Sequence, residues 1–260
     1  MNSYILVAFE PFLSFFLKNF KLFFFCFFLI ACPVYAEDDS VVVSDINQID
    51  IPTASAFDKY AFRFGSRLYS GGGAQVNLGF GIHDRLSLGT SFLIDGLIGN
   101  DTHIRMRVPE IDVKFRFWDG GRYIPAFALG YNGQGYFYDS DLKEYQEDEK
   151  GLYLVGTSEL LPAFFANFGV NMFDFDTNKV YGFIGFNYTL EEVVTIMAEY
   201  DNLFHHVTSQ ERFNAGLRFH ITPEFSVDVA VRDINCSGHY KNGAERHPER
   251  IVQLSYDAKF

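Results

Sequence analysis

The sequence predicts an all-β protein, an antiparallel, up-and-down transmembrane β-barrel of about twelve strands. Three observations predict this fold. Strand-like segments with alternating apolar and polar residues follow one another without a credible helix, tight turns alternate with longer loops, and the chain ends on an amphipathic strand. Because element boundaries inferred from one sequence shift by a few residues, counts of about 10 to 14 strands are compatible with the pattern.

The C-terminal stretch, residues 251–260, has the period of two that a strand with one apolar face produces. The chain ends on Phe260, which belongs to the apolar face. This end resembles the C-terminal signal that the assembly machinery of bacterial outer-membrane barrels reads, and the competing interpretation is an edge strand of a soluble sandwich. The residues expected to form the assembly signal are Val252, Leu254, Tyr256 and Phe260.

The composition agrees with a protein whose outer surface is itself apolar. Aromatic residues make up 18 % of the 260 residues, with 31 Phe and 15 Tyr, more than a soluble core needs. The net charge of −12 argues against a nucleic-acid partner, because binding phosphates requires a basic surface. A barrel also explains why the chain is too polar on average for a helical membrane protein, since alternating strands never accumulate a long apolar run.

The N-terminal residues predict export from the cytoplasm. Lys21 precedes a short apolar run, residues 22–31, and an acidic stretch follows Ala36, as in a secretory signal peptide. The run is too short to span a membrane comfortably as an anchor. A lipobox that would attach lipid to Cys32 is an alternative. The expected organisation is a signal peptide at 1–36, a polar periplasmic leader at 37–58 and an outer-membrane barrel at 59–260.

The expected strands are 59–69, 73–82, 86–95, 110–118, 123–137, 151–160, 163–173, 180–188, 193–201, 211–220, 224–234 and 250–260. Most have one apolar face. The other face carries Gly, Ser, Asn, Gln and Arg, which is typical of a wet or hydrogen-bonded lumen. The segments 151–160 and 180–188 are apolar on both faces, so the pattern does not orient them.

Tight turns alternate with mostly longer connections along the chain. Tight turns are expected at 83–85, 119–122, 161–162, 190–192 and 222–223. The longer connections are 96–109, 138–150, 202–210 and 235–249, and two connections of the same set, 70–72 and 174–179, are short. Outer-membrane barrels have short periplasmic turns and longer extracellular loops. We therefore expect the tight turns and both termini on the periplasmic side.

Several short motifs carry a family resemblance. Pro52-Thr-Ala54 precedes the first strand, residues 181–186 read Tyr-Gly-Phe-Ile-Gly-Phe, and residues 214–218 read Asn-Ala-Gly-Leu-Arg. Together with 198–201 and the turn at 222–223, they resemble the YjbH-like group of outer-membrane barrels of Gram-negative bacteria, over most of residues 50–260. The resemblance implies a role in exopolysaccharide production or export. It supplies no catalytic residues.

The inward faces predict two competing functions. Charges of both signs share the expected lumen. In the first hypothesis they line a narrow pore, or an accessory barrel, for a polar, anionic solute such as a polysaccharide. In the second, the arginines pair with Asp112, Glu199 or Asp228 and close a structural or adhesion barrel that acts through its extracellular loops. The residues expected to line the lumen are Arg63, Arg67, Lys114, Arg116, Glu199, Arg212, Arg218, Asp228 and Arg232.

A third hypothesis, an outer-membrane enzyme with a site at the barrel rim, finds little support. The histidines are scattered, and His205 and His206 would point to opposite faces of a strand. The run 174–178 imitates a calcium loop but lacks its glycine and its final glutamate. The acidic run 139–150 predicts a solvated loop, or one that recruits divalent cations. We expect no enzymatic activity, cofactor or metal; the expected partners are outer-membrane lipid, lipopolysaccharide and the barrel-assembly machinery, with a polysaccharide or small anionic solute as ligand.

Overall fold

The fold is all-β. The computed structural model describes residues 45–70, 72–98, 104–121, 124–139, 141–176, 179–205 and 210–260. The predicted signal peptide, Cys32 and residues 37–44 of the leader lie outside the described residues, as do His103 and His206. No helix among the described residues is long and apolar enough to cross a membrane.

The strands run in sequence order around a single closed wall. Their bounds are β1 Ala61–Tyr69, β2 Gly73–His83, β3 Leu86–Asp95, β4 Arg105–Met106, β5 Glu110–Trp118, β6 Ala126–Asn132, β7 Tyr136–Asp139, β8 Glu144–Glu147, β9 Gly151–Leu161, β10 Phe164–Met172, β11 Tyr181–Leu190, β12 Val194–Leu203, β13 Arg212–His220, β14 Phe225–Arg232 and β15 Glu249–Lys259.

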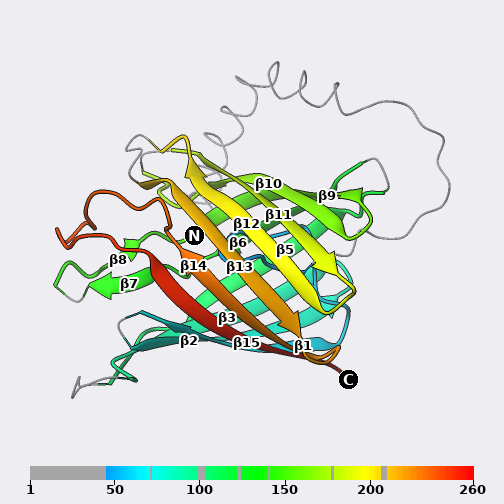
Figure 1. Ribbon diagram of the computed structural model, residues 1–260, viewed down its shortest axis with the longest axis horizontal. Helices are drawn as coiled ribbons and strands as arrows, with labels where there is room; N and C mark the ends of the chain where they lie inside the picture. Colours follow the sequence, from blue (N-terminus) through cyan, green and yellow to red (C-terminus); the bar gives the residue numbers. More distant parts are fainter. Residues whose placement is uncertain are drawn as a thin grey trace, which may run out of the picture.

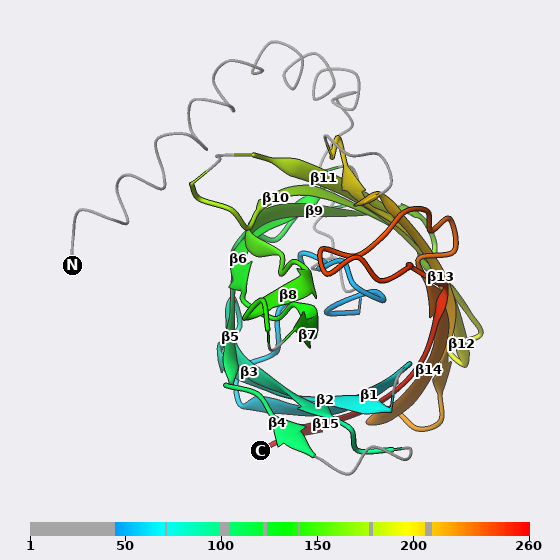
Figure 2. The same cartoon turned by 90° about the vertical axis from the view of Figure 1, so that its left-hand side faces the viewer.

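Twelve of these strands form the barrel. Each pairs antiparallel with the next one along the wall, and β1 pairs with β15 to close it, with the register Ala61 to Lys259. The strands cross the molecule obliquely in Figure 1, and the view along the barrel in Figure 2 shows the closed ring. The two-residue β4 pairs with the end of β3, and β7 and β8 form a separate hairpin. The predicted barrel and its strand number are confirmed.

One expected strand is shorter than the pattern predicts. The segment 123–137 contributes only β6, because the chain leaves the wall after Asn132 and turns inward to form β7 and β8. Gly135 allows this turn, since a Cβ atom there would collide with the Tyr145 ring and the backbone of Glu147. The expected strand 123–137 therefore combined a wall strand with the start of a separate hairpin.

The apolar face of the barrel is its outer surface. Phe80 is 42 % exposed, Phe115 48 % and Leu254 39 %, while the inward-facing Lys114 and Asp228 are each 3 % exposed. A soluble sandwich would bury its aromatic face and expose its charges, so the observed reversal excludes that alternative. An apolar exterior on a closed barrel is what a lipid bilayer requires. The chain is an outer-membrane β-barrel. The expected assembly-signal residues Val252, Leu254, Tyr256 and Phe260 lie on this outer face and are exposed.

Two segments enter the barrel. Residues 45–58, expected to form a periplasmic leader, lie inside the ring in Figure 2. The β7–β8 hairpin projects past the ends of the wall strands in Figure 1, and its base, at Tyr136 and Glu147, reaches Arg67 and Arg212 of the inner wall. Ile51 and Thr53 have no exposed surface. Glu147 and Lys150, at the end of the acidic run expected to be a solvated loop, are 6 % and 9 % exposed. The polar composition of both segments predicted that they are solvated. That prediction was wrong for these residues, because the barrel wall supplies buried partners for their polar groups.

The loops are sorted as predicted. The tight turns join β2 to β3, β5 to β6, β9 to β10, β11 to β12 and β13 to β14, at the end where β1 begins and β15 ends. The longer connections, including β7 and β8, lie at the opposite end (Figure 1). Because outer-membrane barrels have short periplasmic turns and longer extracellular loops, we expect the first end to face the periplasm and the second the cell exterior, and the two ends are named accordingly below.

Thiol labelling of intact cells tests this topology. The connection between β14 and β15 contains the free cysteine Cys236, so the measurement needs a Cys236→Ser background. In that background Lys241→Cys, in an exposed part of the loop, should react with a membrane-impermeant maleimide, and Gly121→Cys, at a position of the periplasmic turn with room for a side chain, should not. Labelling of Gly121→Cys in intact cells would mean that the tight turns face the cell exterior.

Candidate functional site

Residues 45–58, which we call the lumen hairpin, double back inside the barrel. The backbone N–H of Gln48 donates to the carbonyl of Ile51 at 3.0 Å, and Thr53 donates to Ile46 at 3.2 Å. These bonds form a tight turn with Asp50 at its tip. Both ends of the hairpin are held near the periplasmic mouth, by the ion pairs Asp45–Arg218 at 2.7 Å and Asp58–Lys259 at 3.1 Å.

An apolar patch on the inner wall receives one side of the lumen hairpin. Ile51 and Ala54 are fully buried, and a Cβ atom on Gly185 would overlap Ile51 and Gln48. Burying an isoleucine side chain contributes about 1.5–3 kcal/mol. This contact explains why two strands are apolar on both faces: one face meets lipid and the other meets the hairpin. The patch and the hairpin residues that pack on it are Ile51, Ala54, Ala126, Ala128, Tyr153, Val155, Phe165 and Phe183.

Glu199 on β12 binds the backbone of the hairpin tip. Its carboxylate accepts hydrogen bonds from the N–H groups of Ile49, Asp50 and Ile51 at 3.1, 2.9 and 3.3 Å. Asn214 on β13 donates to the same carboxylate at 2.7 Å. A buried carboxylate that accepts several N–H groups in this way fixes the backbone of the tip in one position.

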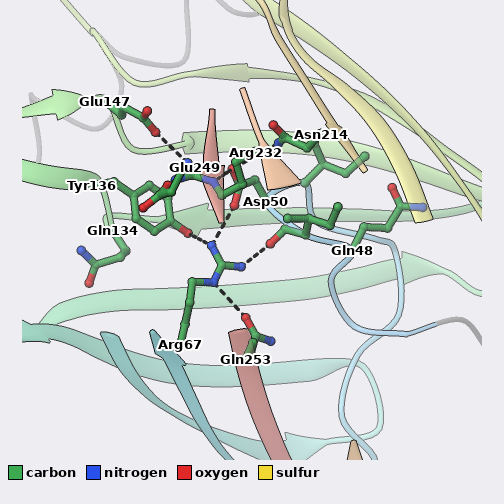
Figure 3. Close-up of polar contacts among 12 residues, drawn as sticks. Gln48, Asp50, Arg67, Gln134, Tyr136, Glu147, Asn214, Arg232, Glu249 and Gln253 are labelled. Atoms are coloured by element: carbon green, nitrogen blue, oxygen red, sulfur yellow. Dashed lines mark hydrogen bonds and ion pairs between the residues drawn. The ribbon is translucent and has the colours of Figure 1, made fainter. Parts of the chain in front are cut away.

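The side chain of Asp50 lies between two wall arginines (Figure 3). Arg67 on β1 donates to Oδ1 at 2.8 Å, and Arg232 on β14 donates to Oδ2 at 2.6 Å. The remaining donors of Arg67 bind Gln253 at 2.9 Å, the Tyr136 hydroxyl at 2.6 Å and the carbonyl of Ile49. The hairpin tip therefore supplies the one carboxylate that forms an ion pair with Arg67 among the described residues.

Arg232 joins the lumen hairpin to the β7–β8 hairpin and to the wall. Its guanidinium pairs with Asp50, with Glu147 on β8 at 2.6 Å and with Glu249 on β15. Arg212 on β13 pairs with the same Glu147 at 2.5 Å. The side chain of Arg232 is 1 % exposed, so this network is closed to solvent and its charges depend on one another.

The arginines keep the two inserted carboxylates ionised. Burial alone would raise the pKa of Asp50, but the attraction of Arg232 and Arg67 outweighs it and holds the pKa well below its ordinary value. The pKa of Glu147 is lowered for the same reason, through Arg232 and Arg212. Because both folded-state values are depressed, these charges stabilise hairpin docking above the ordinary carboxyl pKa, and the contribution is lost as the pH falls through the folded values.

A cavity of about 110 Å³ remains between the lumen hairpin and the wall formed by β1, β2, β3 and β5. Two acceptors of its lining, Gln75 Oε1 and Asp112 Oδ1, are buried without a hydrogen-bond partner among the described residues. Such a polar lining suits water and hydrated solutes. Of the seven charged residues that line the cavity, five are cationic and two are carboxylates: Arg63, Arg67, Lys114, Lys150 and Arg218, against Asp50 and Asp112.

The structure places all of the expected lining residues on the inner face, in different roles. Arg63, Arg67, Lys114 and Arg218 line the cavity. Arg218 also pairs with Asp228 through two bonds of 2.8 Å, as the closed-barrel hypothesis expected. The others hold partners: Arg116 pairs with Asp119 in a periplasmic turn, Glu199 binds the hairpin backbone, and Arg212 and Arg232 bind Glu147.

Sequence reasoning missed Asp50, Tyr136 and Glu147, which complete the network in Figure 3. None lies on a barrel strand, so no alternation marked them. One signal was present. The inward apolar residues Tyr153 and Phe183 required something apolar to cover them, because a water-filled lumen would leave them solvated.

Comparison with known proteins gives the following results. No family model matches the sequence, and no curated protein does. Among solved structures, a KdgM porin is similar at 10 % identity over 75 % of this chain and 98 % of its own, with a TM-score of 0.49. A NanC porin has 9 % identity over 76 % and 99 %, with a TM-score of 0.41. The outer membrane phospholipase A from Escherichia coli has 13 % identity over 78 % and 92 %, with a TM-score of 0.40. Likenesses this weak carry no conclusion about solute or chemistry.

The described residues offer no metal cluster, since no group of three or more His, Cys, Asp or Glu side chains is placed to hold an ion. His220 Nε2 lies 2.9 Å from Thr195 Oγ1, inside the barrel. Thr195 has no exposed surface, so a substrate has no access to this hydroxyl in the state seen. The geometry therefore gives the enzyme hypothesis no accessible pair of nucleophile and base here.

Proposed function

We propose that this chain is a narrow outer-membrane pore for polar, anionic solutes, held nearly closed by the lumen hairpin. The proposal rests on the cavity beside the hairpin, whose charged lining is five cationic residues against two carboxylates. Four of the five also pair with carboxylates, and Lys114 is the one that forms no ion pair among the described residues. A positive lining within a low-dielectric wall attracts anions and repels cations. The chain as a whole is acidic, so this lining reflects placement and not composition.

The lumen hairpin supplies charges that a solute anion would otherwise supply. Its carboxylates Asp45 and Asp50 pair with Arg218, Arg67 and Arg232 of the wall. When the hairpin leaves, these arginines face the lumen with fewer carboxylates around them. A long solute needs this displacement, because the remaining cavity is only about 110 Å³. The resemblance to the YjbH-like group favours a polysaccharide as that solute, and the cationic lining favours an acidic one.

A second function, a closed barrel acting through its loops, is favoured by a different observation. The buried network around Arg232 ties wall, lumen hairpin and β7–β8 hairpin together at one level of the barrel. A barrel whose network never opens conducts nothing. Conductance in a planar bilayer separates the two functions.

Lys114 is the residue that tests the anion path. Its ammonium group donates to the carbonyl of Ile46 at 2.8 Å and lines the cavity, and it forms no ion pair within 4.0 Å among the described residues. We expect the wild-type protein to carry a small anion-selective current. Lys114→Met should lower the ratio of anion to cation permeability several-fold, and Lys114→Glu should lower it further, because the charge in the path changes while the barrel stays intact.

Arg116, two residues along the same strand, is the matched control. It pairs with Asp119 at 3.0 Å in the periplasmic turn and does not line the cavity, so Arg116→Gln should leave the permeability ratio unchanged. A shift on gels after boiling verifies folding of each variant. Absence of current from the wild type and from a variant without the hairpin would overturn the pore and leave the closed barrel.

A further inference from the structure

A second hollow lies at the extracellular mouth of the barrel. Its volume is about 310 Å³, within the range of small-ligand sites. We call it the mouth pocket. Its wall comes from the outer ends of β1 and β3, from the β7–β8 hairpin and from the connection between β14 and β15. Its aromatic lining consists of Tyr69, Phe137, Tyr138 and Tyr240.

The aromatic rings hold one another in place. The Phe137 ring contacts Tyr69 edge-on at 5.8 Å between centroids and Tyr240 at 5.6 Å. The backbone of Phe137 has a φ of 54°, a conformation that bulky residues rarely adopt and that persists only where surrounding contacts impose it. The two tyrosines come from segments far apart in sequence, so the pocket is assembled by the fold and its rings are fixed before a ligand arrives.

Carboxylate and amide oxygens surround these rings. Asp95 accepts hydrogen bonds from the Tyr69 hydroxyl at 3.0 Å and from Arg107 at 2.9 Å. Asp139 accepts from Asn242 Nδ2 at 3.0 Å and from two backbone N–H groups of its own turn. Each carboxylate is therefore held in orientation, and a carboxylate can accept about four hydrogen bonds in all.

The lining contains one buried hydrogen-bond donor without a partner among the described residues, the side-chain amide of Gln146, and a ligand oxygen would satisfy it. Gln146 is 5 % exposed, and its Oε1 accepts from the backbone N–H of Asn242 at 2.7 Å. Its Nε2 has no hydrogen-bond partner among the described residues. Native structures rarely leave such a donor unpaired, and a bound acceptor satisfies it.

We propose that the mouth pocket binds a neutral saccharide unit. Aromatic faces pack against the apolar C–H face of a sugar ring, fixed carboxylate and amide oxygens accept from its hydroxyl groups, and the unpaired amide donor of Gln146 binds a sugar oxygen once that side chain turns toward the pocket. None of the described lining residues is Lys, Arg or His, which disfavours an acidic sugar. A quaternary ammonium would leave Gln146 unpaired. The site is independent of conduction through the lumen.

Saturation-transfer NMR on the full barrel tests this site. The protein is held in a detergent without a sugar headgroup, and the probes are maltose, cellobiose and lactose, with digalacturonate and choline for the competing chemistries. At least one neutral disaccharide should receive saturation, and Tyr240→Ala and Gln146→Ala should each weaken its binding about tenfold or more. Tyr131→Ala, which removes a tyrosine from the lipid-facing surface, should change nothing. Oligosaccharide released from lipopolysaccharide, in the same assay, tells whether the cell's own surface is a source.

Three outcomes overturn the proposal. The first is that none of the three neutral disaccharides receives saturation. The second is that a disaccharide binds equally well to Tyr240→Ala and Gln146→Ala as to the wild type, which places binding elsewhere. The third is that choline or digalacturonate binds better than every neutral disaccharide. A folded barrel in each variant is verified by its gel shift on boiling.

Discussion

Deleting residues 45–56 should raise the single-channel conductance several-fold and make the current more selective for anions. The deletion removes Ile51, Pro52 and Ala54 from the lumen and widens the path. It also removes Asp45 and Asp50, whose charges pair with three wall arginines. Arg67 then has no carboxylate partner among the described residues, so the positive potential along the path increases. Planar-bilayer recording in symmetric and graded KCl measures both effects.

A cross-linked hairpin is the opposite case. Gln48 Nε2 donates to Asn187 Oδ1 at 3.0 Å, so the two side chains meet. In a Cys236→Ser background, a short bis-methanethiosulfonate cross-linker, which fills the space left by the removed amides, should join Gln48→Cys to Asn187→Cys and hold the hairpin on β11. Cross-linked protein should then show the lowest conductance, and a reductant, which cleaves both mixed disulfides, should restore the level before cross-linking. Unchanged conductance in the deletion variant would mean that β7–β8, and not the lumen hairpin, sets the width of the path.

The barrel could be predicted from the sequence because the environment of each wall strand leaves its pattern within that strand's own residues. A strand with lipid on one side and polar partners on the other shows a period of two within its own residues, as in 110–118 and 211–220. The same holds for the turns, since Asp, Gly or Pro marks four of the five directly; the exception is 190–192. The resulting expectations of twelve strands and of loop order agree with the structure.

The contents of the lumen were not predictable in this way. The lumen hairpin has no periodicity, because its partners surround it on many strands and each of its residues meets a different wall position. Asp50 binds Arg67 and Arg232, which are 17 and 182 residues away in sequence. Glu147 belongs to a run of acidic residues, and composition alone cannot separate one buried carboxylate from solvated neighbours. Only the assembled wall determines which acidic residue is enclosed.

Replacing Arg232 by methionine should release both inserted hairpins from the wall. Arg232 is 1 % exposed and pairs with Asp50, Glu147 and Glu249. Methionine fills a similar volume but carries no charge. The three buried carboxylates that pair with Arg232 then lose one positive charge that balances them. Removing one partner of a buried ion pair costs about 3–5 kcal/mol, because the remaining charge is uncompensated. Hydrogen exchange at the N–H groups of Ile49, Asp50 and Ile51, which bind Glu199, should accelerate by about two orders of magnitude or more, because each 1.4 kcal/mol corresponds to a factor of ten.

Arg63 supplies the matched control for this change. It also faces the lumen and pairs with one carboxylate, Asp257, at 2.6 Å, but that partner is 40 % exposed. Partly solvated pairs contribute about 0–1 kcal/mol, so Arg63→Met should leave exchange at the hairpin tip nearly unchanged. Adding Glu147→Gln to Arg232→Met removes one of the carboxylate charges that Arg232→Met leaves without this partner. The double variant should therefore recover part of the protection from hydrogen exchange at the hairpin tip. Equal exchange rates in the two single variants would show that the apolar seat of Ile51, and not the charge network around Arg232, holds the hairpin in the lumen.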